Sequence, residues 1–218
     1  MKRELPVVFR DRSQKARMID AILRDFLGRA VAGLRTLDVG CGNGDISAAF
    51  AEDNRHHAVD IKDQRRSTAC GFDFRLVSSE RLPYDDGYFD IVISHHVIEH
   101  VDDQHLHLAE IHRVLRLGGI AYLATPNRSS PIMKGHVGNE RVLRYRQMLP
   151  LFAEYGFEVH EYGERVAADP EGFHGEVRVA RLLPAFLIRL LRPLFPSQMF
   201  VLVKPQHRPA AAGPAGAS

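Results

Sequence analysis

Three glycines at alternate positions, Gly40, Gly42 and Gly44, are the residues whose type and spacing most clearly suggest a chemistry. They follow a short apolar run, Leu34 to Val39, and an apolar run that ends in glycine predicts a buried strand that stops abruptly. Apolar residues that can form a helix come next, so the glycines would make a turn between a strand and a helix. Such a turn lets a ligand approach the bare backbone, because no Cβ atom stands in the way.

The spacing of these glycines discriminates between ligands. The dinucleotide fingerprint G-x-G-x-x-G would place its third glycine where this sequence has Asp45. Asp38 stands within the strand before the loop, and the two carboxylates would repel a pyrophosphate unless the helix N-terminus outweighed them. The same charges favour a cationic ligand. S-adenosylmethionine, whose sulfonium and ammonium groups are both positive, fits this loop, and its predicted contacts are Asp38, Gly40, Gly42 and Gly44.

A further acidic residue, Asp60, ends the next predicted strand, His57 to Asp60. It lies about 20 residues beyond the glycine loop, where a strand–helix–strand unit places a carboxylate that binds ribose. One carboxylate can accept hydrogen bonds from both vicinal hydroxyls of the sugar. We therefore predict that Asp60 binds the ribose and that Ile61 packs against the adenine. The alternative is a surface aspartate at a strand end.

The order of these motifs, from about Leu34 to Phe157, resembles the class I S-adenosylmethionine-dependent methyltransferases. The resemblance implies an α/β fold with a Rossmann-like, seven-stranded, mostly parallel sheet, helices on both faces and an antiparallel last strand. It also implies transfer of a methyl group. The stretch S-S-E-R-L-P-Y, residues 78–84, is similar to the family segment that holds adenine, although Ser78 stands where the family usually has aspartate. Ser79 and Glu80 are therefore the predicted adenine contacts.

The sequence H-H-V-I-E-H, residues 95–100, follows a fourth predicted strand, Phe89 to Ser94. In open α/β sheets ligands bind beyond the carboxyl ends of the strands, so Ser94, His95 and His96 are expected to face the cofactor or the acceptor. Histidine exchanges a proton near neutral pH. We predict that His96 is a general base for a phenol or hydroxyl, and that Ser94 and His95 contact the cofactor. A structural role for His96 is the alternative.

A metal site is a second interpretation of the same segment. If residues 95–100 are helical, His96, Glu99 and His100 share one face, and His136 follows on a later loop. This arrangement resembles the metal site of some relatives that methylate vicinal hydroxyls, although those usually have glutamate where His96 stands. We predict S-adenosylmethionine as the cofactor and no metal.

The remaining elements are predicted mainly from apolar periodicity. An amphipathic leading helix at about residues 13–27 would cover either the cofactor or only the core. A helix at residues 102–116, with several histidines on a solvated surface, would end in a glycine C-cap at residues 118–119. Pro150 would divide a helix at residues 140–155. Further strands are predicted at residues 72–77, 120–125, 157–162 and 200–204.

A basic apolar segment precedes the last predicted strand. In residues 177–192 arginines stand among leucines, a pattern that suits a helix on an anionic membrane, a wall over a lipophilic substrate, or ordinary packing with arginines reaching solvent. Ordinary packing is the preferred interpretation, and peripheral membrane contact is an alternative. Residues 205–218, rich in Ala, Pro and Gly, predict a disordered tail, which leaves one domain at residues 1–204.

The composition limits the classes of function that the protein can have. The 218 residues, 45% of them hydrophobic, suffice for one domain, and a formal net charge of +2 gives no reason to expect nucleic acid as a partner. Two cysteines provide no disulfide framework, and neither a secretory signal nor a bilayer-spanning run is recognised, so a cytoplasmic location is expected. We predict an O-methyltransferase for a small or lipophilic hydroxylated acceptor. The alternatives are a non-catalytic cofactor-binding protein and, less favoured, a nicotinamide-dependent dehydrogenase.

Overall fold

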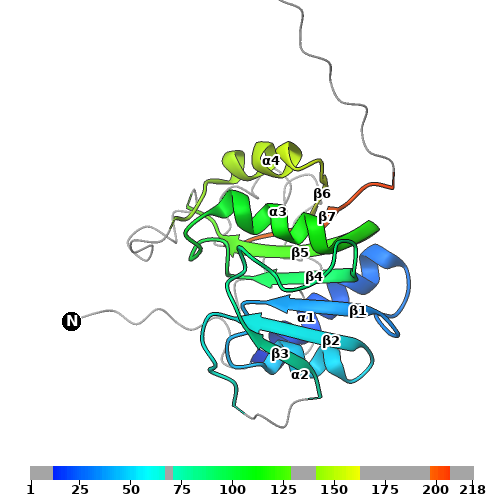
Figure 1. Cartoon of the computed structure of the whole chain (residues 1–218). Helices are drawn as coiled ribbons and strands as arrows, with labels where there is room; N and C mark the ends of the chain where they lie inside the picture. The colour runs from blue at the N-terminus through cyan, green and yellow to red at the C-terminus, as the bar shows by residue number, and fades with distance from the viewer. Residues whose placement is uncertain (1–11, 67–70, 129–140, 163–196, 207–218) are drawn as a thin grey trace, which may run out of the picture.

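The computed structural model describes residues 12–66, 71–128, 141–162 and 197–206. Within these residues seven strands form one sheet, and helices pack on both of its faces (Figure 1). The strands are β1 (Arg35–Val39), β2 (Arg55–Asp60), β3 (Asp73–Leu76), β4 (Phe89–His95), β5 (Leu115–Pro126), β6 (Glu158–Tyr162) and β7 (Ser197–Val203). The helices are α1 (Arg12–Leu27), α2 (Asp45–Ala51), α3 (Gln104–Val114) and α4 (Tyr145–Glu154).

Two of the predicted segments fall outside this description. The basic apolar segment, residues 177–192, is one of them, and the tail from residue 207 onward is the other. None of the described helices has the length and apolar character that crossing a membrane requires.

The strands lie in the order β3-β2-β1-β4-β5-β7-β6. Strands β1 to β5 pair in parallel, and β7 runs antiparallel to both of its neighbours, β5 and β6. The chain starts in the middle at β1, runs outward to β3, and returns to β4 on the other side of β1. This reversal brings the loops after β1 and β4 together at the carboxyl ends of the strands, where open α/β sheets bind ligands. The predicted fold class is confirmed.

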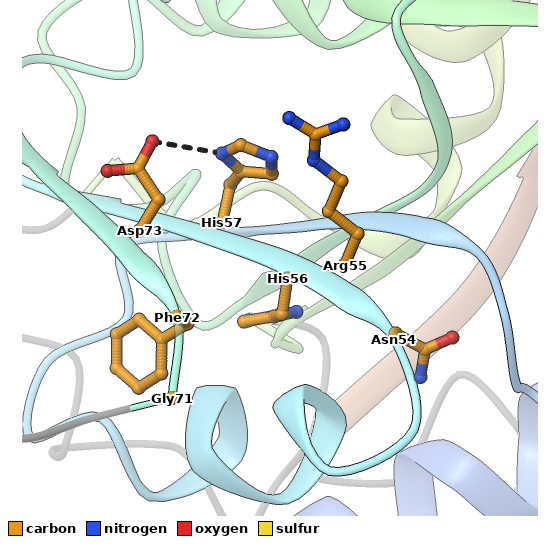
Figure 2. A pocket seen from close by; sticks show the side chains of 7 residues that line it. All are labelled: Asn54, Arg55, His56, His57, Gly71, Phe72 and Asp73. Carbon is orange, nitrogen blue, oxygen red and sulfur yellow. Dashed lines mark hydrogen bonds and ion pairs between the residues drawn. The ribbon is translucent and has the colours of Figure 1, made fainter.

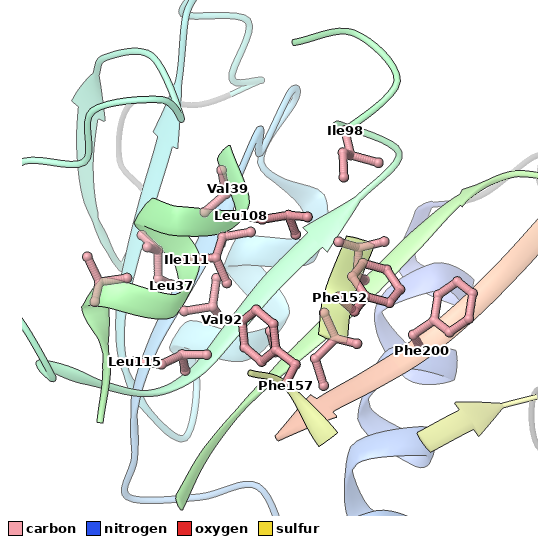
Figure 3. Packing of buried hydrophobic residues seen from close by; sticks show 14 of the residues in the cluster. Leu37, Val39, Val92, Ile98, Leu108, Ile111, Leu115, Phe152, Phe157 and Phe200 are labelled. Atoms are coloured by element: carbon pink, nitrogen blue, oxygen red, sulfur yellow. The ribbon is translucent and has the colours of Figure 1, made fainter. Parts of the chain in front are cut away.

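Side chains that alternate along the strands build an apolar core on each face of the sheet. One core includes α1 and α2, and the other includes α3 and α4 (Figure 1). Figure 3 shows the second core, in which Leu108 and Ile111 of α3 gather with Val92 of β4, and the Phe152 ring of α4 lies 5.1 Å from the Phe200 ring of β7. Burying each such side chain contributes about 1.5–3 kcal/mol, so the strand ends that carry the site are held firmly.

Helix α1 occupies the range predicted for the leading helix and packs on the first core. Its residues Ile19, Ile22 and Leu23 are fully buried, in the same core as Ile91 and Ile93 of β4. The described part of α1 therefore covers the core, the simpler of its two predicted roles.

The glycine C-cap predicted at residues 118–119 is wrong. Helix α3 ends at Val114, and β5 begins at Leu115 without a glycine between them. The carbonyls at the helix end are instead satisfied by the residue after β7, because Lys204 Nζ donates to the carbonyls of His112 and Leu115 at 2.8 and 2.7 Å. The two glycines lie inside β5, where the register with β4 shifts. Gly118 has a φ of +70°, so it makes an irregularity in a strand.

Pro150 does not divide the helix in which it stands. Helix α4 runs without a break from Tyr145 to Glu154 and contains Pro150, and it begins later than predicted. Proline lacks the N–H that would bond the carbonyl four residues earlier, at Arg146, and both residues are exposed to solvent. The start of the helix is held by two hydrogen bonds, from Arg144 N to Gln147 Oε1 at 2.9 Å and from Gln147 N to the Arg144 carbonyl at 2.8 Å.

Candidate functional site

The glycine loop that joins β1 to α2 has a backbone that other residues rarely adopt. Gly40, Gly42 and Gly44 have φ values of +74°, +54° and +82°. Gly40 N donates to the carbonyl of Val59 at 2.8 Å, which ties the loop to β2. A Cβ atom on Gly40 would lie 2.5 Å from a methyl group of Val97, in the segment after β4. The loop therefore sits tightly between the ends of β2 and β4, at the reversal of strand order.

Asp60 stands at the carboxyl end of β2 and faces the same loop. Its Oδ2 accepts a hydrogen bond of 2.8 Å from Gly42 N, and its Oδ1 accepts one of 3.0 Å from Lys62 N. A carboxylate offers about four lone-pair positions, so two hydrogen bonds leave capacity for two hydroxyls. Ile61 is 67% exposed beside it, which is unusual for a large apolar side chain at a strand end. This arrangement fits a ribose and a flat base.

The side chain of Asp38, which was predicted to contact the ligand, is bonded within the protein. It is buried, and its Oδ2 accepts a hydrogen bond of 2.6 Å from Ser47 Oγ, so it joins β1 to α2. The neighbouring Cys41 is a free thiol; burial first, and then the carboxylates of Asp38 and Asp60, raise its pKa. Cys41 therefore stays protonated and is not a nucleophile. Asp38 can act on a ligand through its charge and through the loop that it positions.

The segment after β3 lies next to Asp60, as a site for adenine requires. Val77 N donates to the carbonyl of Asp60 at 2.9 Å. Ser79 is buried, and one oxygen of Glu80 accepts a hydrogen bond of 2.6 Å from Asp103 N at the start of α3. Ser78 Oγ, which stands where aspartate was expected, accepts from Glu80 N at 3.2 Å. Part of the hydrogen-bonding capacity of this segment is therefore used within the protein.

The side chain of Ser94 does not face the ligand site. It is fully buried, and its Oγ lies 3.1 Å from Nε2 of His107, which is also fully buried on α3. Burial lowers the pKa of His107 to about 4. Strand alternation explains the correction, because Ser94 points to the face covered by α3. Several histidines of this helix were expected on a solvated surface; His105 is exposed, but the buried His107 departs from that expectation.

His95, the next residue, points to the opposite face of the sheet. Its ring stacks on Tyr122 of β5 with 6.1 Å between centroids, and Tyr122 Oη lies 3.5 Å from His95 Nδ1. Burial raises the pKa of Tyr122, so this phenol stays protonated. His95 is half-buried at the carboxyl end of β4.

His96 has the backbone of a strained residue. Its φ is +58°, and within the described residues no other non-glycine residue has a positive φ. Its N–H donates to the carbonyl of Ala124 at 2.9 Å, and its Nδ1 lies 3.1 Å from Glu99 Oε1. The other oxygen of Glu99 accepts a hydrogen bond of 3.1 Å from Thr125 Oγ1 at the end of β5. The Glu99 side chain is 1% exposed and that of His96 33%, so a buried carboxylate supports a partly exposed imidazole.

The segment after β4 is a turn, and this bears on the metal interpretation. His100 N donates to the carbonyl of Val97 at 2.8 Å, and no helix forms at residues 95–100. In the part of the chain that the structure describes, no group of three or more histidine, cysteine or acidic side chains could hold a metal ion. His136, the fourth residue of that alternative interpretation, lies outside the described residues.

A hollow of about 550 Å³ lies at the other end of β2, away from Asp60 (Figure 2). Its two histidines point to opposite faces of the sheet, and His57 Nδ1 lies 3.1 Å from Asp73 Oδ2. His56 Nδ1 lies 2.7 Å from Thr36 Oγ1, and burial is the main cause that lowers the pKa of His56 to about 3. The hollow is at the amino ends of the strands, so it is separate from the glycine loop. Its lining residues are Asn54, Arg55, His56, His57, Gly71, Phe72 and Asp73.

Comparisons with known proteins agree with this geometry. Residues 37–123 match the family model described as a methyltransferase domain. Over 110 residues the chain is 34% identical to a ubiquinone biosynthesis O-methyltransferase of Rhizobium rhizogenes, covering 46% of this chain and 44% of that protein. The chain spans about half the length of such relatives.

Solved structures share the fold. A methyltransferase of Haloferax volcanii, in complex with the Trm112 methyltransferase activator, matches with a TM-score of 0.63 and 19% identity over 91% of this chain and 96% of that one. A SAM-dependent methyltransferase from Archaeoglobus fulgidus matches with a TM-score of 0.60 and 20% identity over 87% and 94%. Residues 37–123 thus match a methyltransferase domain, and the fold is the one found in class I, S-adenosylmethionine-dependent methyltransferases, as the resemblance implies.

Proposed function

We propose that the protein is an S-adenosylmethionine-dependent methyltransferase that methylates a hydroxyl group of a small or lipophilic acceptor. The observation that carries the proposal is the 2.8 Å hydrogen bond from Gly42 N to Asp60 Oδ2, because it joins a ligand-binding loop to a carboxylate placed for a ribose. Support for O-methylation comes from the relatives that carry this activity in their names.

The residues around the loop fit this cofactor. The bare backbone of the loop would receive its amino-acid part, Asp60 its ribose hydroxyls and Ile61 its adenine. The negative charges of Asp38 and Asp45 would favour its positive groups over a pyrophosphate. Ser79, Glu80 and His95 complete the proposed binding surface.

The chemistry is divided between the cofactor and the protein. S-adenosylmethionine supplies, when bound, a methyl group on a positively charged sulfur that keeps the electron pair of the broken bond. The protein has to align the acceptor oxygen and remove its proton. We assign the second task to His96. Because Nδ1 is engaged by Glu99, Nε2 is the nitrogen that takes the proton.

Transfer of labelled methyl groups to catechol and to 4-alkylcatechols of increasing chain length tests this proposal. We expect labelled methyl ethers, and a rise in turnover with chain length would assign a lipophilic acceptor. His96→Ala should lower turnover by about 10²-fold or more while cofactor affinity hardly changes. A protein that binds the cofactor but transfers no label to any hydroxylated compound would support the non-catalytic alternative.

In this proposal, residues 177–192 provide an additional contact with the acceptor or with a membrane. Their arginines and leucines suit a helix beside a lipophilic acceptor or on an anionic membrane. Sedimentation with anionic and neutral vesicles checks this, because peripheral contact predicts binding to the anionic vesicles that decreases with salt. We also propose that the protein is cytoplasmic and that residues 1–204 form one domain.

A further inference from the structure

Glu99 and Thr125 make a connected pair behind His96. Glu99 belongs to the turn after β4 and Thr125 to the end of β5, 26 residues further along the chain. Both are buried, and the two oxygens of Glu99 are divided between His96 Nδ1 and Thr125 Oγ1, each at 3.1 Å. The carboxylate therefore connects the imidazole to the sheet.

The chemistry of these groups determines where the proton lies. An ionised carboxylate can only accept hydrogen bonds, so the His96 nitrogen beside it carries a hydrogen. In the neutral ring the other nitrogen, Nε2, then has the lone pair. Thr125 donates to the second oxygen, which keeps the buried carboxylate hydrogen-bonded on both sides. The pair thus selects one tautomer of His96.

The backbone of His96 points to the same conclusion. A φ of +58° at a residue with a Cβ persists only where the surroundings hold it. The surroundings here are the bond from His96 N to the carbonyl of Ala124, the contact of the ring with His95 at 4.6 Å between centroids, and Glu99. Strain of this kind is typical of residues that must present a side chain in one direction.

We propose that Glu99 and Thr125 are positioning residues that hold His96 as the Nδ1–H tautomer with Nε2 available to the acceptor. Glu99 also stabilises the imidazolium that forms when Nε2 takes the proton of the acceptor hydroxyl. Neither residue touches the acceptor in this account. The kinetic part of the proposal rests on the proposed function, whereas the tautomer does not.

The tautomer can be measured without any substrate. Two-bond ¹H–¹⁵N correlation spectra of the full chain above neutral pH report which ring nitrogen carries hydrogen, and His96→Gln identifies the signal. We expect Nδ1–H in the wild type. In Glu99→Gln, Thr125 should still donate to the side-chain oxygen, so the new amide would donate to Nδ1 and switch His96 to Nε2–H. An Nε2–H wild type, or no change in Glu99→Gln, would overturn the proposal.

Kinetics separate positioning from a structural role. With a hydroxylated acceptor found by the labelling assay, Glu99→Gln should lower kcat by about 10²-fold or more and change the acceptor KM less than about threefold. The double variant His96→Gln/Glu99→Gln should be no slower than His96→Gln alone, because the two residues act as one unit. A double variant whose loss of kcat equals the product of the two single losses would contradict the pairing. Full activity in His96→Gln itself would instead refute the proposed base and leave the tautomer result standing.

Thr125→Val provides a milder test if Glu99→Gln fails to fold. It leaves the carboxylate in place and removes only its second hydrogen bond, so we expect a loss in kcat of about tenfold and a weaker preference for Nδ1–H. The matched control is Thr36→Val, which removes a buried threonine hydroxyl beside His56 at the opposite end of the strands. Equal losses of kcat in the two threonine variants would overturn the assignment of Thr125.

Discussion

The buried pair of Ser94 and His107 makes the stability of the protein depend on pH in a direction that can be worked out. Burial holds the pKa of His107 at about 4, below the ordinary value of 6.5 that it regains on unfolding. Below pH 6.5 the unfolded chain therefore binds a proton that the folded chain does not, so acid favours unfolding. The difference between the two pKa values contributes about 3 kcal/mol to the free energy of unfolding. This contribution is present in full above pH 6.5 and is lost as the pH falls from 6.5 to 4.

Urea unfolding at pH 7.5 and pH 5.0 measures this effect. His107 should account for about 2 kcal/mol of the stability that the wild type loses between these two values. His107→Gln can keep a hydrogen bond to Ser94 but cannot gain the proton, so its loss should be smaller by that amount. His105→Gln, on the exposed side of the same helix, is the matched control. If His107→Gln loses as much stability as the wild type, then His107 is not buried and Ser94 could face the ligand after all.

Two substitutions test the cofactor site itself. Asp60→Ala should weaken S-adenosylmethionine binding by about 2–3 kcal/mol in calorimetry, because hydrogen bonds to a charged acceptor are lost; unchanged affinity would remove Asp60 from the site. Gly40→Ala should lower the melting temperature and the affinity together, because a φ of +74° is strained for alanine and its Cβ would meet Val97 at 2.5 Å. A wild-type melting curve for Gly40→Ala would show that the loop has room to adjust.

The parts of the site that could be predicted from the sequence are those that neighbouring residues define. The glycine loop needs only its own backbone and the strand before it, and the place of Asp60 follows from the length of one strand–helix–strand unit. Such features are encoded in short stretches, which is why the loop and Asp60 lie together in the structure as their spacing suggested.

Contacts between distant segments could not be predicted in the same way. The carboxylate of Glu99, which contacts His96, is also bonded to Thr125 at the end of β5, and the buried Ser94 is paired with His107 on α3. Such pairs depend on register and strand alternation, which become definite only once the sheet has formed. The C-cap prediction at residues 118–119 was wrong for a related reason. Glycine is typical both of a helix C-cap and of an irregularity in a strand, so the residue type alone does not distinguish them.

Calorimetric titration of the full chain with S-adenosylmethionine, and separately with NAD⁺, tests the central claim most directly. A glycine loop joined to Asp60, with Asp45 in place of the third glycine of a dinucleotide site, predicts saturable binding of S-adenosylmethionine and none of NAD⁺. Binding of NAD⁺ without binding of S-adenosylmethionine would contradict the account.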